Sequence, residues 1–227
     1  RAGTKNDPAW DFAYNDENGA IKGAAEFQLD DGITYMYWAT ASSIARRAMN
    51  SGGKDLPWTN ATQDYKVEKI SSSAVWHTMA LASGQLNIAN AEGLASITFS
   101  DAFDPFDLNI RPGNFINAIE ERDDFIILGS EREDEGEEGH IWGWITTATN
   151  WVQKKRVPIK GVNALIFTET PLLQGGSNGE IFPADFLNTV PLARVPGGGI
   201  VNPGGVSILD DLAVFGIFGG TYPGIWS

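Results

Sequence analysis

The sequence contains no cysteine. The chain therefore has no disulfide, no thiolate metal site and no thiol nucleophile, which excludes a cysteine peptidase. Histidine is also scarce, since the only two are His77 and His140, and neither belongs to the HExxH pattern of a zinc enzyme. We expect neither a metal ion nor a cofactor.

Basic residues are also few. The 227 residues hold 16 Lys and Arg against 29 Asp and Glu, which gives a formal net charge of −13. Such an acidic surface repels phosphate backbones, so we expect no nucleic-acid partner. The sequence also lacks an apolar run of the ~20 residues that a transmembrane helix requires, and we predict no transmembrane segment.

Apolar residues are nevertheless plentiful enough for a core, at 42% of the chain. Residues 38–49 place Trp38, Ala41 and Ala45 on one face at helical spacing, which predicts a helix. Residues 71–83 and the short segment 115–122 are also predicted as helices.

Strand-like patterns follow these segments. Residues 125–128 form a continuous apolar run, and residues 140–145 are predicted as the returning strand of a hairpin. The acidic stretch between them fits a solvated hairpin tip better than a calcium site. With a third strand at 164–169, the order of helices before strands predicts an α+β fold with an antiparallel sheet.

The end of the chain has a different composition. Residues 196–205 have the Gly- and Pro-rich composition of a flexible linker, and the apolar residues after them require a partner surface. We therefore predict one domain at 1–190 and a Gly-rich apolar extension at 191–227. The extension is expected to dock on a protein partner or to mediate self-assembly.

Three segments resemble a known family. They are Asp30-Asp31-Gly32 running into Tyr37-Trp38-Ala39, then residues 115–129, then Gly139-His140 with the strand at 164–169. In this order they resemble the immunoglobulin-degrading branch of the papain-like cysteine peptidases, over roughly residues 28–170. The resemblance implies a papain-like fold in which Tyr37 stands at the catalytic cysteine, His140 at the histidine and Glu169 at the orienting acid.

The tyrosine changes what this resemblance implies. A phenol has a pKa near ~10 and is a poor acyl acceptor, and its bulk would fill the substrate slot. The resemblance then implies a degenerate peptidase scaffold, a pseudoenzyme with vestigial residues. We favour a structural reading of His140 as a strand histidine and of Tyr37 as a core aromatic, and Glu169 is read at least as well as a solvent-facing carboxylate.

Tryptophans supply the other binding candidates. Of the eight, Trp10, Trp58 and Trp226 lie in predicted loops or at the ends of the chain, where an indole can meet a ligand. We predict a non-catalytic structural, assembly or protein-binding module, and we read the start at Arg1 as a processed product that is secreted or attached to the cell surface. The alternatives are a hydrolase that uses His140 with Glu169, and a carbohydrate-binding module.

Overall fold

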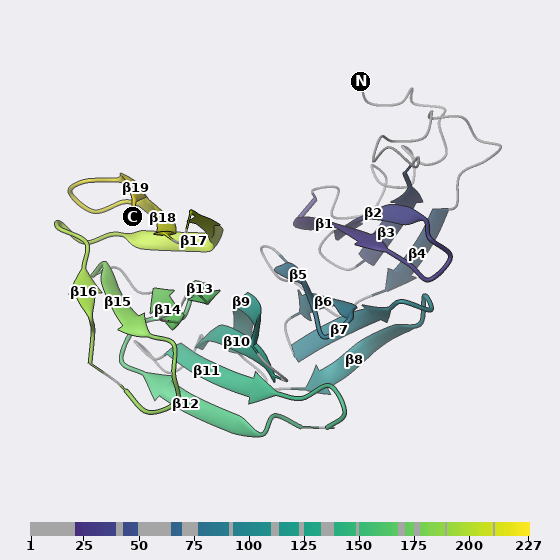
Figure 1. Cartoon of the computed structure of the whole chain (residues 1–227), viewed down its shortest axis with the longest axis horizontal. Coiled ribbons are helices and arrows are strands. Elements are labelled where there is room, and N and C mark those ends of the chain that lie inside the picture. The colour runs from purple at the N-terminus through teal and green to yellow at the C-terminus, as the bar shows by residue number, and fades with distance from the viewer. Residues whose placement is uncertain are drawn as a thin grey trace. The chain divides into compact units, whose positions relative to one another are not determined.

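The computed structural model describes residues 21–39, 43–49, 65–69, 77–90, 93–109, 114–122, 125–132, 139–148, 150–167, 171–174, 178–188, 190–210 and 212–227 (Figure 1). The chain divides into two compact units, Arg1–Asp107 and Leu108–Ser227. The boundary predicted between residues 190 and 191 stays a prediction. Each unit consists of consecutive β-strands that pair with their neighbours in the sequence.

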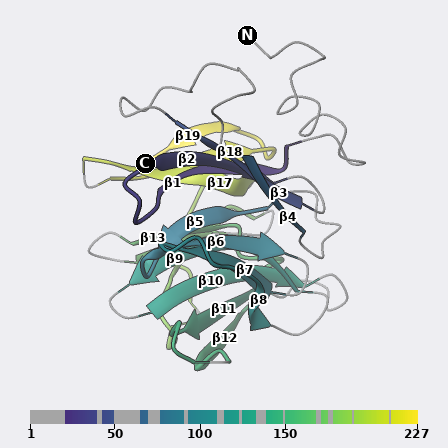
Figure 2. The ribbon, with the colours of Figure 1, turned by 90° about the vertical axis from the view of Figure 1, so that its right-hand side faces the viewer.

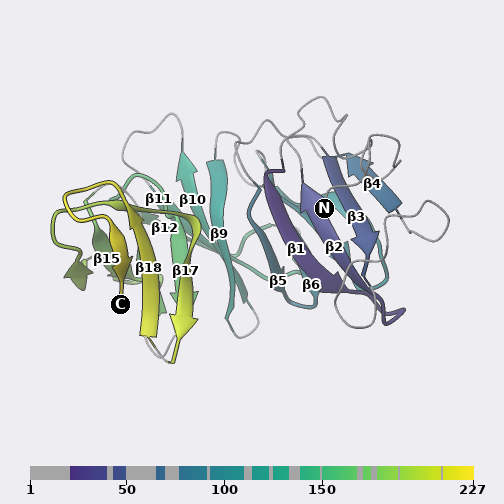
Figure 3. The same ribbon diagram turned by 90° about the horizontal axis from the view of Figure 1, so that it is seen from above.

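The first unit holds two four-stranded sheets. Figure 3 shows the strands of the first sheet side by side, and they are β1 (Gly23–Gln28), β2 (Thr34–Ala39), β3 (Ser43–Ala48) and β4 (Tyr65–Lys69). The second sheet, whose last strand runs across the unit boundary, contains β5 (Met79–Ala82), β6 (Gln85–Asn90), β7 (Gly93–Thr98) and β8 (Phe103–Asn109).

One core joins these two sheets. Alternate residues of a strand face the same side, so Tyr35 and Tyr37 on β2 share a face, as do Leu86 and Ile88 on β6. All four are buried in a single cluster together with Ile97 of β7. The period of two in the sequence is therefore what allows the sheets to pack face to face.

The second unit holds three sheets. The first has the order β12-β11-β10-β9, as Figure 2 shows, and its strands are β9 (Asn114–Arg122), β10 (Phe125–Arg132), β11 (Gly139–Trp144) and β12 (Gln153–Val157). The next contains β13 (Ala164–Phe167), β14 (Pro171–Gln174), β15 (Glu180–Pro183) and β16 (Ala193–Arg194). The last has three strands, β17 (Ile200–Leu209), β18 (Leu212–Phe218) and β19 (Gly224–Trp226).

Neighbouring sheets of the second unit also pack face to face. Leu165 of β13 and Ile141 of β11 belong to one buried cluster, and Ile166 of β13 belongs to another with Phe215 and Ile217 of β18. The strand β13 therefore contributes to both cores from its two faces. Sheets of consecutive strands that stack in this way are typical of the blades of β-propellers.

The α+β prediction is wrong, because the described residues contain no helix. The predicted helix at 38–49 instead contains the end of β2 and all of β3, and Trp38 pairs with Ala45 across them. The segment 115–122 belongs to β9, where Ile119 pairs with Leu128 of β10. Alanine, arginine and glutamate favour helices locally, but pairing with the adjacent strands overrides that preference. Nothing helical in the described residues could span a lipid bilayer.

The papain-like resemblance is overturned by the same pairing. Its first segment forms a strand of a four-stranded sheet instead of entering a helix, and its second segment forms strand β9. The predicted hairpin is confirmed, since β10 and β11 pair antiparallel with Leu128 opposite Trp142. Of the predicted helix at 71–83, residues 71–76 lie outside the described residues and Met79–Ala82 forms β5.

The stretch predicted as a flexible linker is part of a sheet. Strand β17 begins at Ile200, and the register of its pairing with β18 shifts between Val201 and Val206. Such a bulge accommodates extra residues within a strand. Just before it, Gly199 has a φ of +120°, and a Cβ there would lie 2.3 Å from the Cγ2 of Ile217. This position therefore requires glycine.

Candidate functional site

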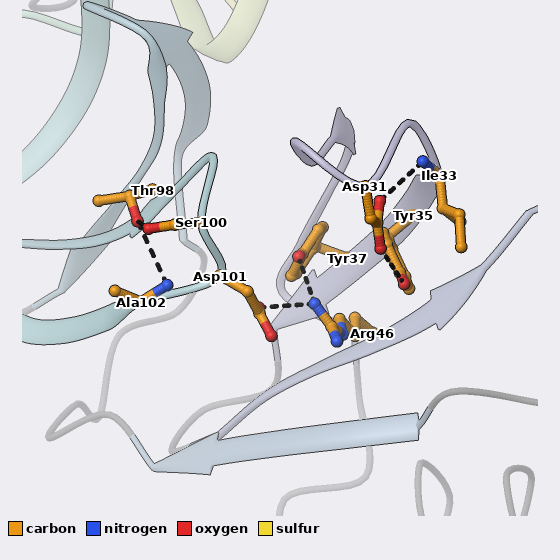
Figure 4. Close-up of polar contacts among 9 residues, drawn as sticks. All are labelled: Asp31, Ile33, Tyr35, Tyr37, Arg46, Thr98, Ser100, Asp101 and Ala102. Atoms are coloured by element: carbon orange, nitrogen blue, oxygen red, sulfur yellow. Dashed lines mark hydrogen bonds and ion pairs between the residues drawn. The ribbon is translucent and has the colours of Figure 1, made fainter.

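Tyr37 lies in a buried polar cluster of the first unit (Figure 4). Its hydroxyl accepts a hydrogen bond from Nη1 of Arg46 at 3.2 Å, and the same nitrogen lies 2.6 Å from Oδ1 of Asp101. The guanidinium also stands over the ring of Tyr35, 4.2 Å from its centroid, and the Tyr35 hydroxyl donates to Asp31 at 3.0 Å. The cluster thus joins β2 and β3 to the turn between β7 and β8.

The space beside Tyr37 is too small for a ligand. The cavity that Tyr37, Arg46 and Asp101 line has a volume of about 10 Å³, which is at or below the space that one water molecule needs. Arg46 is buried and Asp101 compensates its charge, so the cluster is a satisfied polar contact between two sheets. Tyr37 is therefore a core aromatic residue of the first unit.

His140 lies in the second unit, on β11, where it is buried between Ser130 and Arg156 of the neighbouring strands. Its ring centroid is 5.7 Å from that of Trp142, whose indole nitrogen donates to Oγ of Ser130 at 2.8 Å. Glu169 falls outside the described residues. The hydrolase alternative, which requires His140 and Glu169 together, therefore stays a prediction.

The predicted absence of a metal site also stays a prediction. Within the described ranges, no group of three or more His, Asp or Glu side chains could hold a metal ion. Of the acidic stretch in the β10–β11 hairpin, Glu131 is described and residues 133–138 lie outside.

Trp226 is the predicted binding residue that the structure describes, since Trp10 and Trp58 lie outside the described residues. It stands half-buried on β19, and its indole nitrogen donates to the backbone oxygen of Tyr222 at 3.3 Å. This side chain packs against the core shared by the last two sheets. The side chain also lines an open groove.

This groove, called the C-terminal groove below, has a volume of about 410 Å³. It lies between the sheet that ends in β16 and the sheet that ends in β19, which Figure 1 shows next to each other. Its walls are mainly apolar side chains and are formed by Leu172, Ile181, Leu192, Ala193, Arg194, Val195, Pro196, Leu212, Ala213, Phe215, Trp226 and Ser227. Both its volume and its apolar lining are typical of a binding site.

Arg194 is the charged side chain in this lining. Its Nε donates to the backbone oxygen of Asn178 at 2.9 Å, which fixes the orientation of the guanidinium. Among the described residues, no carboxylate side chain pairs with Arg194, and none contributes to the groove wall. In a chain with a net charge of −13, Arg194 is therefore the one cation among the described residues of the groove wall, with Glu180 opposite it on β15.

A buried lysine fixes the loop that leads to the groove. Nζ of Lys155 on β12 donates to the backbone oxygens of Asp185, at 2.6 Å, and of Asn188. Burial lowers the pKa of Lys155, and the nearby Asp185 carboxylate opposes that shift. The loop then continues through Val190 to Leu192, both of which are exposed.

The carboxylate of Asp185 closes the same loop. Its Oδ1 accepts hydrogen bonds from the backbone nitrogens of Leu187, at 2.7 Å, and of Asn188, at 2.6 Å. Burial alone would raise the pKa of Asp185, but these bonds, the Asn188 side chain and the charge of Lys155 together lower it to about 2. The loop that precedes β16 is therefore stabilised by the charge of Lys155 as well as by hydrogen bonds to its backbone nitrogens.

Sequence reasoning found Trp226 but missed the rest of the groove. Leu172 and Ile181 look like ordinary core residues of a strand, and they reach the groove because β14 and β15 pack beside β18. Arg194 carried a weak signal, since it is a lone cation between the apolar residues Ala193 and Val195 in an acidic chain. The sugar-binding alternative, which depends on exposed tryptophans, stays a prediction.

No family model matches this sequence, and no curated protein matches it. Several solved structures are similar to it, and two of them are the following. The chain is 11% identical to the "AfRom2 CNH domain", with 89% of this chain and 63% of that chain covered at a TM-score of 0.49. It is 13% identical to a structure described as the "Dos1 propeller", with 88% and 55% covered at a TM-score of 0.48.

The chain thus spans 55% to 63% of the length of these two structures. Because both TM-scores lie below 0.5, the fold described above rests on the strand pairing of this chain itself.

Proposed function

We propose that this chain is a non-catalytic protein-binding module that holds a partner protein in the C-terminal groove. Propeller-type sheets serve many unrelated functions, so the proposal rests on the site and not on the fold. The observation that carries it is an apolar groove of about 410 Å³ with the indole of Trp226 in its wall. Half-buried tryptophans are among the residues that contribute most to protein interfaces.

The chemistry of the lining supports binding over catalysis. General acid–base catalysis requires a side chain such as His, Asp, Glu or Lys beside the substrate. The described residues that line the groove include none of these, and the one ionisable side chain among them is that of Arg194, which stays charged at any ordinary pH. The secreted or cell-surface location is a further part of the proposal and rests on the sequence alone.

Site-specific photo-crosslinking tests the proposal. A benzoylphenylalanine replaces Leu212, which lines the groove and is 54% exposed, or Leu81 on β5, which is 56% exposed and lies in the other unit. Both full-length proteins are irradiated in extracts of the cells that produce the chain. We expect a discrete protein adduct at position 212 that is absent at position 81 and is lost when Trp226→Ala is added. Equal adducts at both positions, or an adduct that Trp226→Ala does not change, would contradict the proposal.

A further inference from the structure

We infer that the partner enters the C-terminal groove as an extended peptide segment that presents an acidic side chain to Arg194 and apolar side chains on either side of it. This inference rests on the proposed function and specifies the chemistry of the partner. Three features of the groove lead to it, namely its single cation, its two strand edges and its dimensions.

The cation selects an acidic group. The Nε of Arg194 is already bound to the backbone oxygen of Asn178, so the guanidinium is held in place before a ligand arrives. Arginine binds a carboxylate through two parallel hydrogen bonds, which give the pair a defined geometry. Among the described residues of the groove wall none is acidic, and Glu180, which lies opposite Arg194 in the pairing of β15 with β16, is not part of that wall, so an acidic group of the partner can complement the charge of Arg194.

The strand edges select an extended backbone. In the described part of the second unit, β16 pairs only with β15, and β19 pairs only with β18. Among the described strands, the sheet that ends in β19 has three and the other four sheets have four each. An edge of this kind offers backbone N–H and C=O groups to an incoming strand, which is how many domains bind extended peptides.

The dimensions set the pattern of side chains. Strand β19 contains three residues, so at ~3.3 Å per residue it can pair with a segment of about three to five residues. Side chains of a strand alternate between its faces, so every second residue of the ligand faces the groove. A segment with the pattern apolar–polar–acidic–polar–apolar then places its acid between two apolar contacts, as the surroundings of Arg194 require.

Fluorescence anisotropy with three labelled peptides tests this inference on the full-length chain. The peptides contain Leu-Thr-X-Thr-Leu, where X is Asp, Asn or Lys. We expect the Asp peptide to bind about threefold more tightly than the Asn peptide, since Arg194 is exposed and solvent weakens its ion pairs. Arg194→Gln should abolish this preference, while Arg156→Gln, an exposed arginine of β12, should preserve it. Trp226→Ala should weaken binding of the Asp and Asn peptides alike.

Other occupants give distinct results, and each of these would overturn the inference. If hexanoate displaces the Asp peptide at equal concentration, the groove binds small aliphatic acids. If peptide binding falls as the chain self-associates in sedimentation, the occupant is a second copy. If deletion of residues 1–20 is needed before the peptide binds, the occupant is the chain's own segment. No binding at about 1 mM peptide, or binding without a preference for acid, also overturns it.

Failure of the inference can be told apart from failure of the proposed function. Binding that depends on Trp226 but not on the acid removes the peptide chemistry and leaves the groove as a protein-binding site. A missing adduct at position 212 in the crosslinking experiment removes the groove itself.

Discussion

Nη1 of Arg46 lies 2.6 Å from Oδ1 of Asp101, and this ion pair connects β3 to the turn that follows β7. The Arg46 side chain is 7% exposed and the Asp101 side chain 30% exposed. A guanidinium so far from solvent depends on its anion, because desolvation of an unpaired charge is costly. The pair therefore links the two sheets of the first unit.

We predict that Asp101→Asn destabilises the chain strongly. Removing one partner of a buried pair costs ~3–5 kcal/mol, and the partial exposure of Asp101 reduces this to about 2 kcal/mol or more. Urea unfolding followed by tryptophan fluorescence measures the loss. Asp30→Asn serves as the control, since Asp30 is an exposed aspartate of the same unit. Equal stabilities of the two variants would show that the pair is not needed.

A smaller loss of folding stability is expected for Tyr37→Phe. The substitution removes the hydroxyl that accepts a hydrogen bond from Arg46 at 3.2 Å but keeps the buried ring. A net cost of about 1 kcal/mol follows from one lost hydrogen bond. Thermal unfolding of the variant checks this value, and an unchanged melting temperature would mean that the hydroxyl contributes nothing.

The stability of the second unit should fall in acid because of Asp185. Its pKa is lowered from 3.8 to about 2 in the folded chain, so its charge favours folding at pH values above 3.8. That contribution is lost as the pH falls from 3.8 through about 2. Asp185→Asn should therefore be less stable than the wild type at pH 6, and the difference should vanish near pH 2. Asp210→Asn, at an exposed aspartate of the β17–β18 turn, is the matched control variant.

Glu120 on β9 should behave in the opposite way. Burial raises the pKa of its carboxyl above the ordinary value of 4.5, so ionised Glu120 opposes folding at neutral pH. Glu120→Gln should then stabilise the chain at pH 7, and the gain should disappear as the pH falls below 4.5. Glu26→Gln on the exposed face of β1 provides the comparison. A gain that persists in acid would show that packing, and not charge, is responsible.

Gly199→Ala should destabilise the last sheet. The φ of +120° at this position is open almost only to glycine, and the added Cβ would lie 2.3 Å from Ile217. Backbone strain alone costs ~1–3 kcal/mol, to which the clash adds. Gly216→Ala is the matched control on β18, where the nearest atom would lie at 3.4 Å. Similar melting temperatures for the two variants would contradict the conclusion that position 199 requires glycine.

Local patterns predicted the hairpin of β10 and β11 but not the fold as a whole. The apolar run from Phe125 to Leu128 is continuous and short, which is typical of a buried strand. The acidic stretch after it is typical of a turn, so the two together predicted a hairpin. The helix predicted at residues 38–49 was wrong because Trp38, Ala41 and Ala45 also recur at helical spacing. What decides their structure is pairing of Tyr37 with Ala25 and Arg46, which lie on two other strands.

The groove was less predictable still. Trp226 was identified from its place near the end of the chain, but its partners come from β14, β15, β16 and β18. Such a set forms only when two sheets pack together, and no spacing in the sequence encodes that packing. Arg194 is part of the groove because β16 ends one sheet where the next sheet ends in β19.

The most direct test of the account is the affinity of the protein captured at position 212 for two tryptophan variants of the full-length chain. Trp226→Ala changes the groove wall, whereas Trp151→Ala changes a tryptophan of the same unit that is 40% exposed and lies outside the groove. By calorimetry, we predict that Trp226→Ala weakens binding by at least about tenfold and that Trp151→Ala leaves it unchanged. Equal affinities for the wild type and Trp226→Ala would contradict a binding site in the C-terminal groove.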